Sequence, residues 1–150
     1  MCDISAFSVK LPLAPRAILI DVELKIPTIV DRAEETVCIK TKALIDTGAN
    51  GSCISKRLVS ACKLRPVSAM KMISAHGLSI AQVYEISMLL PGGILFSDIP
   101  AVEVAGGRAF DVIIGMDILA GSDFAFSSND SESCFSMRLP SAHEVIDFSK

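Results

Sequence analysis

Two apolar runs in the sequence each end at a tight turn, and each is followed by a short segment that favours a helix. The first is Ala43-Leu44-Ile45-Asp46-Thr47-Gly48-Ala49, and the second is Phe110-Asp111-Val112-Ile113-Ile114-Gly115-Met116-Asp117-Ile118-Leu119. Short apolar runs bounded by turn formers are typical of buried strands. The likeness of the two runs predicts two half-domains that fold alike.

Asp46 is the ionisable residue with the most unusual setting. It follows three apolar residues and precedes a cluster of turn formers that runs to Gly51. A strand would therefore deliver a carboxylate to a tight turn, where backbone N–H groups can hydrogen-bond it and fix its orientation. The alternative for an isolated Asp-Thr-Gly is an Asx-turn, in which the aspartate only caps the loop.

Hydrophobic periodicity elsewhere predicts many short strands and two short helices. Residues 16–25 alternate, with Ile20, Val22 and Leu24 on one face, and Pro27 is expected to end this strand. Ser55 is placed to cap a helix that runs through Cys62. The other predicted elements are strands over 36–45, 67–90 (two strands around a turn at Ala75-His76-Gly77), 94–104, 111–114, 123–127 and 134–139, and one or two helical turns over 116–120. This pattern predicts an all-β barrel or sandwich.

Length and composition are those of one globular domain. The chain has 150 residues, of which 51% are hydrophobic and 21% charged, and this excludes a disordered polyelectrolyte. We expect a single domain over residues 1–150, with a core from about 17 to 139. The polar tail over 141–150 is expected to fray.

Charge and residue spacing argue against several classes of partner. The formal net charge is −3, so nothing favours binding to nucleic acid. The two longest stretches without charged residues, 72–84 and 86–97, are shorter than the roughly 20 residues of a spanning helix, so we expect no membrane span.

Five cysteines without a Cys-x-x-Cys pair and only two histidines predict no metal site, and we expect no cofactor. The N-terminus shows no secretory signal, which predicts a cytoplasmic protein unless processing has removed one.

The turn Asp46-Thr47-Gly48-Ala49 and the downstream run Ile113-Ile114-Gly115 together resemble the motifs of the retropepsin-like aspartic proteases. The resemblance covers residues 17–126 and includes the order and spacing of three features. In that family the Asp-Thr-Gly-Ala turn carries the catalytic aspartate, the Ile-Ile-Gly strand forms a ψ-shaped loop packed against it, and a hairpin between them forms a flap. The resemblance therefore implies a closed β-barrel, with Asp46 as the catalytic residue and Ala75-His76-Gly77 at the flap tip.

The single Asp-Thr-Gly of this chain implies that two copies act together. One carboxylate must take a proton from water while another, protonated, polarises the scissile carbonyl. Two carboxylates in contact share a proton because both cannot easily ionise. The resemblance thus implies a homodimeric endopeptidase, in which Asp46 of each chain helps to activate a water that attacks a protein or peptide substrate without metal or cofactor.

Further roles follow from the same resemblance. Thr47 would hydrogen-bond across the dimer axis, and Gly48 would let the substrate approach the backbone closely. Ala49 stands where pepsin-like enzymes usually have serine. The strands near the two ends of the chain, 4–7 and 134–137, would interleave with those of the partner subunit, or they would be surface appendages of a chain that extends past the catalytic unit.

Several polar residues have structural interpretations beside the functional one. His76 is either an exposed turn residue or a flap residue that contacts substrate. The acidic residues Asp111, Asp117 and Asp123 are expected to cap the second helix or to pair with Arg108 at the surface.

Two other functions stay open from the sequence. The first is a catalytically silent module that keeps the retropepsin fold for dimerisation or peptide binding. The second is a small β-barrel that binds an apolar ligand, which the apolar composition alone favours. The intact Asp46-Thr47-Gly48 turn favours an active peptidase over both.

Overall fold

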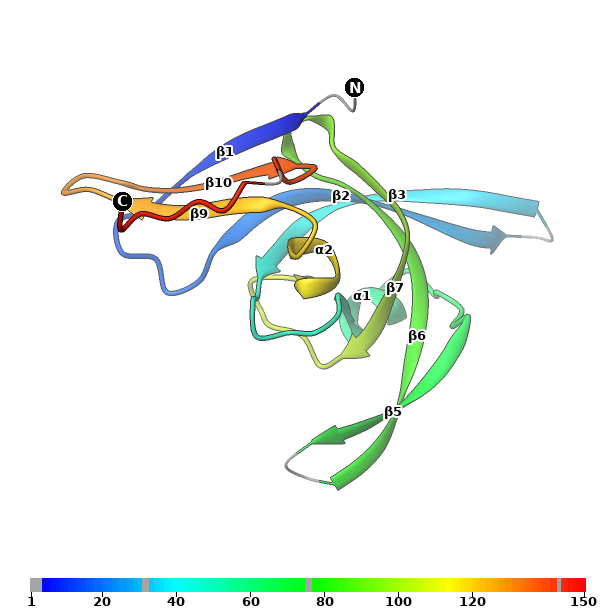
Figure 1. The fold of residues 1–150 in the computed structure, drawn as a ribbon. Helices are drawn as coiled ribbons and strands as arrows, with labels where there is room; N and C mark the ends of the chain where they lie inside the picture. The colour runs from blue at the N-terminus through cyan, green and yellow to red at the C-terminus, as the bar shows by residue number, and fades with distance from the viewer. Residues whose placement is uncertain (1–3, 31–32, 75–76, 143) are drawn as a thin grey trace.

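The computed structural model describes residues 4–30, 33–74, 77–142 and 144–150. Strands make up most of its regular structure, as the hydrophobic periodicity predicts (Figure 1). The strands are β1 (Ser5–Leu11), β2 (Leu19–Val30), β3 (Ala33–Ile45), β4 (Cys53–Ser55), β5 (Ser68–Ser74), β6 (Gly77–Leu89), β7 (Leu95–Val104), β8 (Val112–Ile114), β9 (Asp123–Ser128) and β10 (Ser133–Leu139). The helices are α1 (Lys56–Ala61), the 3-10 turn η1 (Pro91–Gly93) and α2 (Met116–Leu119). The predicted all-β class is confirmed.

The larger sheet has seven strands in the order β2-β3-β8-β4-β7-β6-β5. The short strand β8 lies parallel to β3 and antiparallel to β4, and β4 lies parallel to β7. Strand β2 also pairs with β6 over Glu23–Lys25, so the sheet curls back toward its own first strand. The two apolar runs of the sequence, which end β3 and form β8, therefore lie side by side.

Strand β2 continues through Pro27, so the prediction that this proline ends the strand is wrong. Pro27 lies opposite Thr36 in the ladder with β3. The pairing of β2 with β6 has already stopped at Lys25. Beyond that point β2 is an edge strand, and an edge position tolerates a residue without a backbone N–H.

The core is formed by the inward faces of these strands. Ile20, Val22 and Leu24 are buried, as the alternation in the sequence predicts, and they pack with side chains of β6 and β8 such as Ile86 and Ile114. Burial of apolar surface at about 25 cal/mol per Å² is the main favourable contribution to such a core. The core therefore supports β3, which leads to Asp46, and β8, which pairs with the end of β3.

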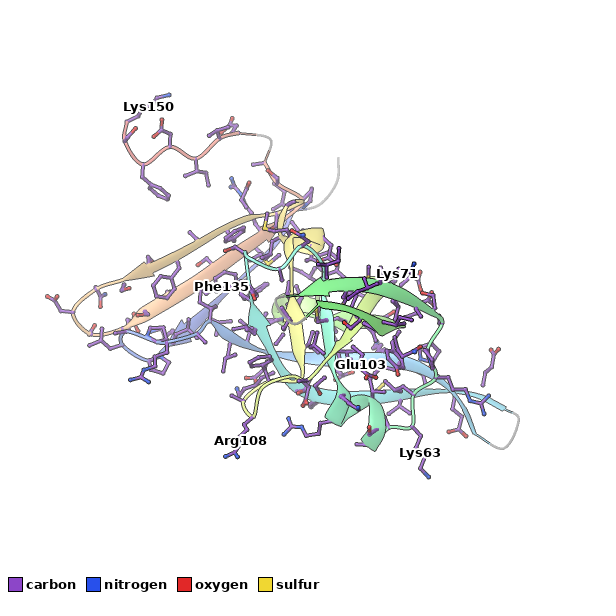
Figure 2. All side chains as sticks on the ribbon, turned by 90° about the horizontal axis from the view of Figure 1, so that it is seen from below. Lys63, Lys71, Glu103, Arg108, Phe135 and Lys150 are labelled. Atoms are coloured by element: carbon purple, nitrogen blue, oxygen red, sulfur yellow. The ribbon has the colours of Figure 1, made fainter. Side chains whose placement is uncertain are left out.

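A smaller sheet joins the two ends of the chain, with the order β1-β10-β9. Strands β1 and β10 pair with each other along their full length within one chain, and their interleaving with the strands of a partner subunit stays a prediction. Phe135 of β10 is fully buried and its ring lies 6.3 Å from those of Phe7 and Phe124. Figure 2 shows Phe135 where the smaller sheet meets the rest of the molecule.

Two hairpins, β2–β3 and β5–β6, extend from the body in different directions (Figure 1). The β5–β6 hairpin occupies the position predicted for the flap. Ile73, Leu78 and Ile80 are 87%, 67% and 70% exposed, so this hairpin presents large apolar side chains to solvent. No helix in the described part of the chain is long and apolar enough to cross a membrane.

The start of the tail is fixed by Asp123, although the sequence predicts that the tail frays. The carboxylate of Asp123 accepts hydrogen bonds from the Ala142 N–H (2.8 Å), the Ser141 hydroxyl (2.7 Å) and Arg138 Nε (2.6 Å). These three hydrogen bonds lower the pKa of Asp123 to about 2, and the bond from Ala142 has the largest effect, followed by those from Ser141 and Arg138. Farther along, the tail stands off from the strands as far as Lys150 (Figure 2).

The lowered pKa of Asp123 predicts that the tail anchor weakens in acid. A carboxylate with a depressed pKa in the folded state stabilises it fully above the ordinary pKa, and this stabilisation is lost as the pH falls toward about 2. Asp123→Asn is therefore expected to reduce the pH dependence of the urea midpoint between about pH 4 and pH 2. Asp130→Asn, on the exposed loop before β10, should keep the wild-type pH dependence. Equal pH dependence in wild type and Asp123→Asn would contradict the assignment.

Candidate active site

The end of β3 positions Asp46 at a tight turn. Its backbone N–H donates to the Ile114 carbonyl at 3.1 Å, which ties the turn to the end of β8. The Gly48 N–H donates to Oδ1 of Asp46 at 2.9 Å, so a backbone group fixes the carboxylate, and this contact between residues two apart is also that of the Asx-turn named as the alternative. Oδ2 receives no hydrogen bond from the described residues and is available to another molecule.

Gly48 allows this contact because it has no Cβ. A Cβ on this residue would lie 3.2 Å from Asp46 Oδ1, which is tighter than an ordinary contact. Thr47 and Gly48 are exposed, and Asp46 and Ala49 are half-buried. The turn is thus presented at the surface while its carboxylate keeps one orientation.

Asp46 lines an open cavity of about 490 Å³. Its other walls include Arg16, Ile18, Ile45 and Phe126. A surface depression whose walls are mostly apolar, with one oriented carboxylate and one arginine, can hold a polar reacting group beside an apolar side chain of a ligand.

Gly115 packs directly against the turn that follows Asp46. A Cβ on Gly115 would lie 2.7 Å from both the carbonyl carbon and oxygen of Gly51, and 2.9 Å from the Ala49 oxygen. The next residue, Met116, donates its N–H to the same Ala49 oxygen at 2.8 Å. The structure therefore brings the predicted segment Ile113-Ile114-Gly115 against the turn at Asp46, and only glycine permits that approach.

Ser52 and Asp117 form a second link that the sequence reasoning missed. Asp117 accepts the Ser52 hydroxyl and the Ser52 N–H, each at 2.9 Å, and also the N–H of Ile118. The Ser52 hydroxyl, which is fully buried, accepts in turn from the Gly115 N–H at 3.3 Å. Ser52 follows the turn and Asp117 follows the glycine, so this polar pair connects the two motifs.

Ser52→Ala is expected to destabilise the fold by about 1–3 kcal/mol, because it removes a buried hydroxyl that bonds a carboxylate and leaves the Gly115 N–H without its acceptor. The free energy of unfolding in urea measures the effect. Ser60→Ala, at an exposed position of α1, is the matched control and should change stability by less than about 0.5 kcal/mol. Equal stability of the two variants would show that the Ser52 link does not support the turn.

Asp111 connects β3, α1 and β8 at the other end of β8. Its carboxylate accepts hydrogen bonds from Thr41 (2.9 Å), Ser55 (2.6 Å) and Arg57 (2.8 and 3.1 Å). Burial opposes ionisation, but the hydrogen bonds from Ser55, Arg57 and Thr41 outweigh it and lower the pKa of Asp111. The cation beside Asp111 is Arg57, so the expected pairing with Arg108 is wrong for this residue.

The other two acidic residues also have partners different from Arg108. Asp123 pairs with Arg138, and Asp117 bonds Ser52. Asp117 does accept from the Ile118 N–H in α2, so the expectation that it caps this helix is met in part. The helix α1 begins as predicted, since the Ser55 hydroxyl accepts from the Leu58 N–H at 3.1 Å.

The flap residues are only partly within the described structure. Ala75 and His76 lie outside the described residues. Gly77 begins β6 with a φ of 109°, a conformation that glycine adopts at little cost. Ser74 and Gly77 are opposite each other in the β5–β6 ladder, so the hairpin forms around the predicted turn.

The thiol of Cys53, near the turn at Asp46, has a raised pKa that makes it a poor nucleophile. Burial raises the pKa of Cys53, and the charges of Asp117 and Asp46 raise it further. A thiol with a raised pKa stays protonated at neutral pH and is a poor nucleophile. In the ranges that the structure describes, no three histidine, cysteine or acidic side chains gather to hold a metal ion.

The curled sheet, the parallel β3–β8 pair and the Asp-Thr-Gly turn together define a protein of the retropepsin-like class. A family model described as gag-polyprotein putative aspartyl protease matches residues 39–121, which is more than half of the chain. The chain belongs to this family, and the resemblance found in the sequence is confirmed.

Three solved structures are similar to this chain at low sequence identity, and one of them has a TM-score above 0.5. A retropepsin-like aspartic protease from Rickettsia conorii is similar over 92% of this chain and 97% of its own, with 14% identity and a TM-score of 0.52. The simian foamy virus (mac) protease is similar over 69% and 92%, with 15% identity and a TM-score of 0.46. The retroviral protease-like domain of Ddi1 from Leishmania major is similar over 81% and 98%, with 18% identity and a TM-score of 0.37. The likeness to the Rickettsia protein supports the fold alone, and a search of curated proteins finds no match to this chain.

Proposed function

We propose that this protein is an aspartic endopeptidase that works as a homodimer. The observation that carries the proposal is the carboxylate of Asp46, which one backbone N–H orients through Oδ1 while Oδ2 stays open beside a cavity. The family of the chain supports a peptidase, and a second copy supplies the second carboxylate. In this proposal the curled sheet acts as a closed barrel that holds the two turns together.

The chemistry divides between the two copies of Asp46. The ionised carboxylate takes a proton from a water molecule, and the water oxygen forms a bond to the scissile carbonyl carbon. The protonated carboxylic acid donates to the carbonyl oxygen as the tetrahedral intermediate forms. The intermediate then breaks its C–N bond as the leaving amine receives the proton that the first carboxylate took from water, and one hydroxyl of the intermediate returns its proton to the other carboxylate. Two carboxylates in contact favour this mixed protonation because they repel each other when both are ionised.

The neighbouring residues have supporting roles in this proposal. Thr47 links the two turns across the dimer axis, while Gly48 and Ala49 form the wall along which the substrate backbone lies. The segment Ile113-Ile114-Gly115 supports the turn from beneath. The hairpin tip Ala75-His76-Gly77 closes over the substrate and excludes water.

An incubation with an unstructured protein tests the proposal. The protein at several concentrations and pH values is expected to cleave an unfolded substrate such as reduced, alkylated casein, and its specific activity should rise with its own concentration as dimers form. Cleavage sites identified by mass spectrometry then give the substrate preference. Absence of cleavage at every pH, combined with a dimer in solution that binds the peptide, would instead establish the silent peptide-binding module.

A further inference from the structure

A cavity of about 690 Å³ lies at the end of β8 opposite to Asp46. Asp111, which lines it, immediately precedes β8, while Asp46 contacts the residue that ends β8. The other walls come from β2, β3, α1, the end of β6 and the loop before β8. Figure 2 shows Arg108 reaching out from this loop. The cavity therefore shares no wall residue with the catalytic turn.

The inner part of this cavity is apolar. Leu89, Leu90, Pro91 and Ala109 line it, and Val22 contributes from β2. Leu90 and Val22 are almost fully buried, so the floor belongs to the core and does not need to move for a ligand to enter. Small-molecule sites are typically cavities of roughly 300–1,000 Å³ with apolar walls and a few polar groups, and this cavity meets that description.

Arg57 supplies a fixed cation at the rim. Its Nε and Nη2 atoms donate to Asp111 Oδ1 at 3.1 and 2.8 Å, and Thr41 and Ser55 hold the same carboxylate. The Nη1 amino group donates to none of the described residues. A guanidinium whose position is already fixed loses little side-chain entropy when it binds a carboxylate.

The remaining charges of the rim leave a basic surplus. Lys42 already pairs with Asp21 at 2.8 Å. Lys40, Arg108 and Glu23 form no ion pair with any residue that the structure describes, although Glu23 lies opposite Lys40 in the β2–β3 ladder. Once the existing pairs are set aside, the lining of the cavity holds two cations, Lys40 and Arg108, and one carboxylate, Glu23.

We propose that this cavity is a second binding site, which takes a small molecule with a carboxylate group and an apolar chain. The carboxylate contacts Arg57 Nη1 together with Arg108 and Lys40, and the chain lies on Leu89, Leu90 and Ala109. Charge complementarity selects an anion, and the apolar floor selects a chain over a simple inorganic ion. This site stands independently of the proposed peptide hydrolysis.

A titration of the isotope-labelled full chain with octanoate, kept below its micelle concentration, tests the proposal by NMR. Saturable chemical-shift changes are expected at the amides of Val22, Leu89 and Ala109. Octan-1-ol has the same chain without the charge and should bind at least severalfold more weakly. Equal binding of the two probes, or shifts confined to the exposed apolar residues Ile73, Leu78 and Ile80, would overturn the proposal.

Substitutions at the rim separate the charge from the cavity. The double variant Lys40→Gln/Arg108→Gln should bind octanoate about tenfold more weakly, because each exposed charge pair is worth a factor of roughly two to five. Neither side chain has an ion-pair partner among the described residues, so the fold should persist. Ala109→Glu places a repelling carboxylate in the cavity and should abolish binding. Lys71→Gln, at an exposed lysine of β5 (Figure 2), is the matched control and should bind as the wild type. Wild-type affinity in the double variant and in Ala109→Glu would exclude this site.

Discussion

Asp46→Asn is expected to reduce peptide-bond hydrolysis by a factor of about 10³, because general acid–base catalysis contributes about 10²–10⁴ and both proton transfers involve this residue. Asparagine keeps the size of the side chain. Its oxygen can still accept the hydrogen bond that the Gly48 N–H donates to Oδ1, so the turn is preserved. Stability is therefore expected to stay within about 1 kcal/mol of the wild type. Initial cleavage rates on an unfolded protein, with urea denaturation in parallel, measure the two effects.

Asp21→Asn is the matched control for this substitution. Asp21 is an exposed aspartate that pairs with Lys42, also exposed, and such surface pairs contribute about 0–1 kcal/mol. It should therefore retain full hydrolytic activity. Activity that persists in Asp46→Asn would reject the assignment of Asp46, whereas a loss in both variants would indicate a general effect of charge.

Mixing the wild type with excess Asp46→Asn tests whether two copies share one site. Each mixed dimer holds a single ionisable carboxylate at its centre and cannot supply both the acid and the base. Wild-type activity should therefore fall as the inactive variant is added at constant wild-type concentration. A constant activity would show that one chain is sufficient, and the homodimeric mechanism would be wrong even if Asp46 is essential.

The parts of the fold that the sequence predicted well depend on local physics. The alternation of Ile20, Val22 and Leu24 marks a strand because side chains on a strand alternate between two faces. Ser55 marks the start of α1 because its hydroxyl accepts a hydrogen bond from the Leu58 N–H, which has no backbone acceptor in the first turn of the helix. The orientation of Asp46 by a turn N–H is equally local, since the donor is two residues away.

The parts that the sequence did not predict depend on contacts between distant segments. Ser52 and Asp117 are 65 residues apart, and nothing near either residue distinguishes a buried hydrogen-bonded pair from a loop serine and a helix cap. The pairing of β1 with β10 joins residues such as Ser8 and Ser136, which are 128 residues apart. The prediction that β2 ends at Pro27 is wrong for the same reason, because the destabilisation that a proline causes in a strand depends on where the pairing with the neighbouring strand β6 stops.

Gly115→Ala is expected to impair both folding and hydrolysis, because the close contact beneath the turn leaves no room for a side chain. The added Cβ would lie 2.7 Å from backbone atoms of Gly51 and 2.9 Å from the Ala49 oxygen. Backbone atoms cannot rotate away as a flexible side chain can, so the turn itself must move. Such overpacking costs about 1–3 kcal/mol. The movement also weakens the bond from the Met116 N–H to the Ala49 oxygen, which adds about 0.5–1.5 kcal/mol.

The same displacement should lower hydrolysis by about 10², since a shift of about 1 Å in a reacting group has an effect of this size. Gly121→Ala is the matched control, because a Cβ there meets only the Ile118 oxygen at 3.8 Å, an ordinary contact. It should change stability by less than about 0.5 kcal/mol and leave hydrolysis unchanged. Urea denaturation and cleavage rates of both variants isolate the contact, because each adds one methyl group and they differ in what that group meets. A Gly115→Ala protein as stable and active as Gly121→Ala would mean that the turn carrying Asp46 does not need β8 beneath it.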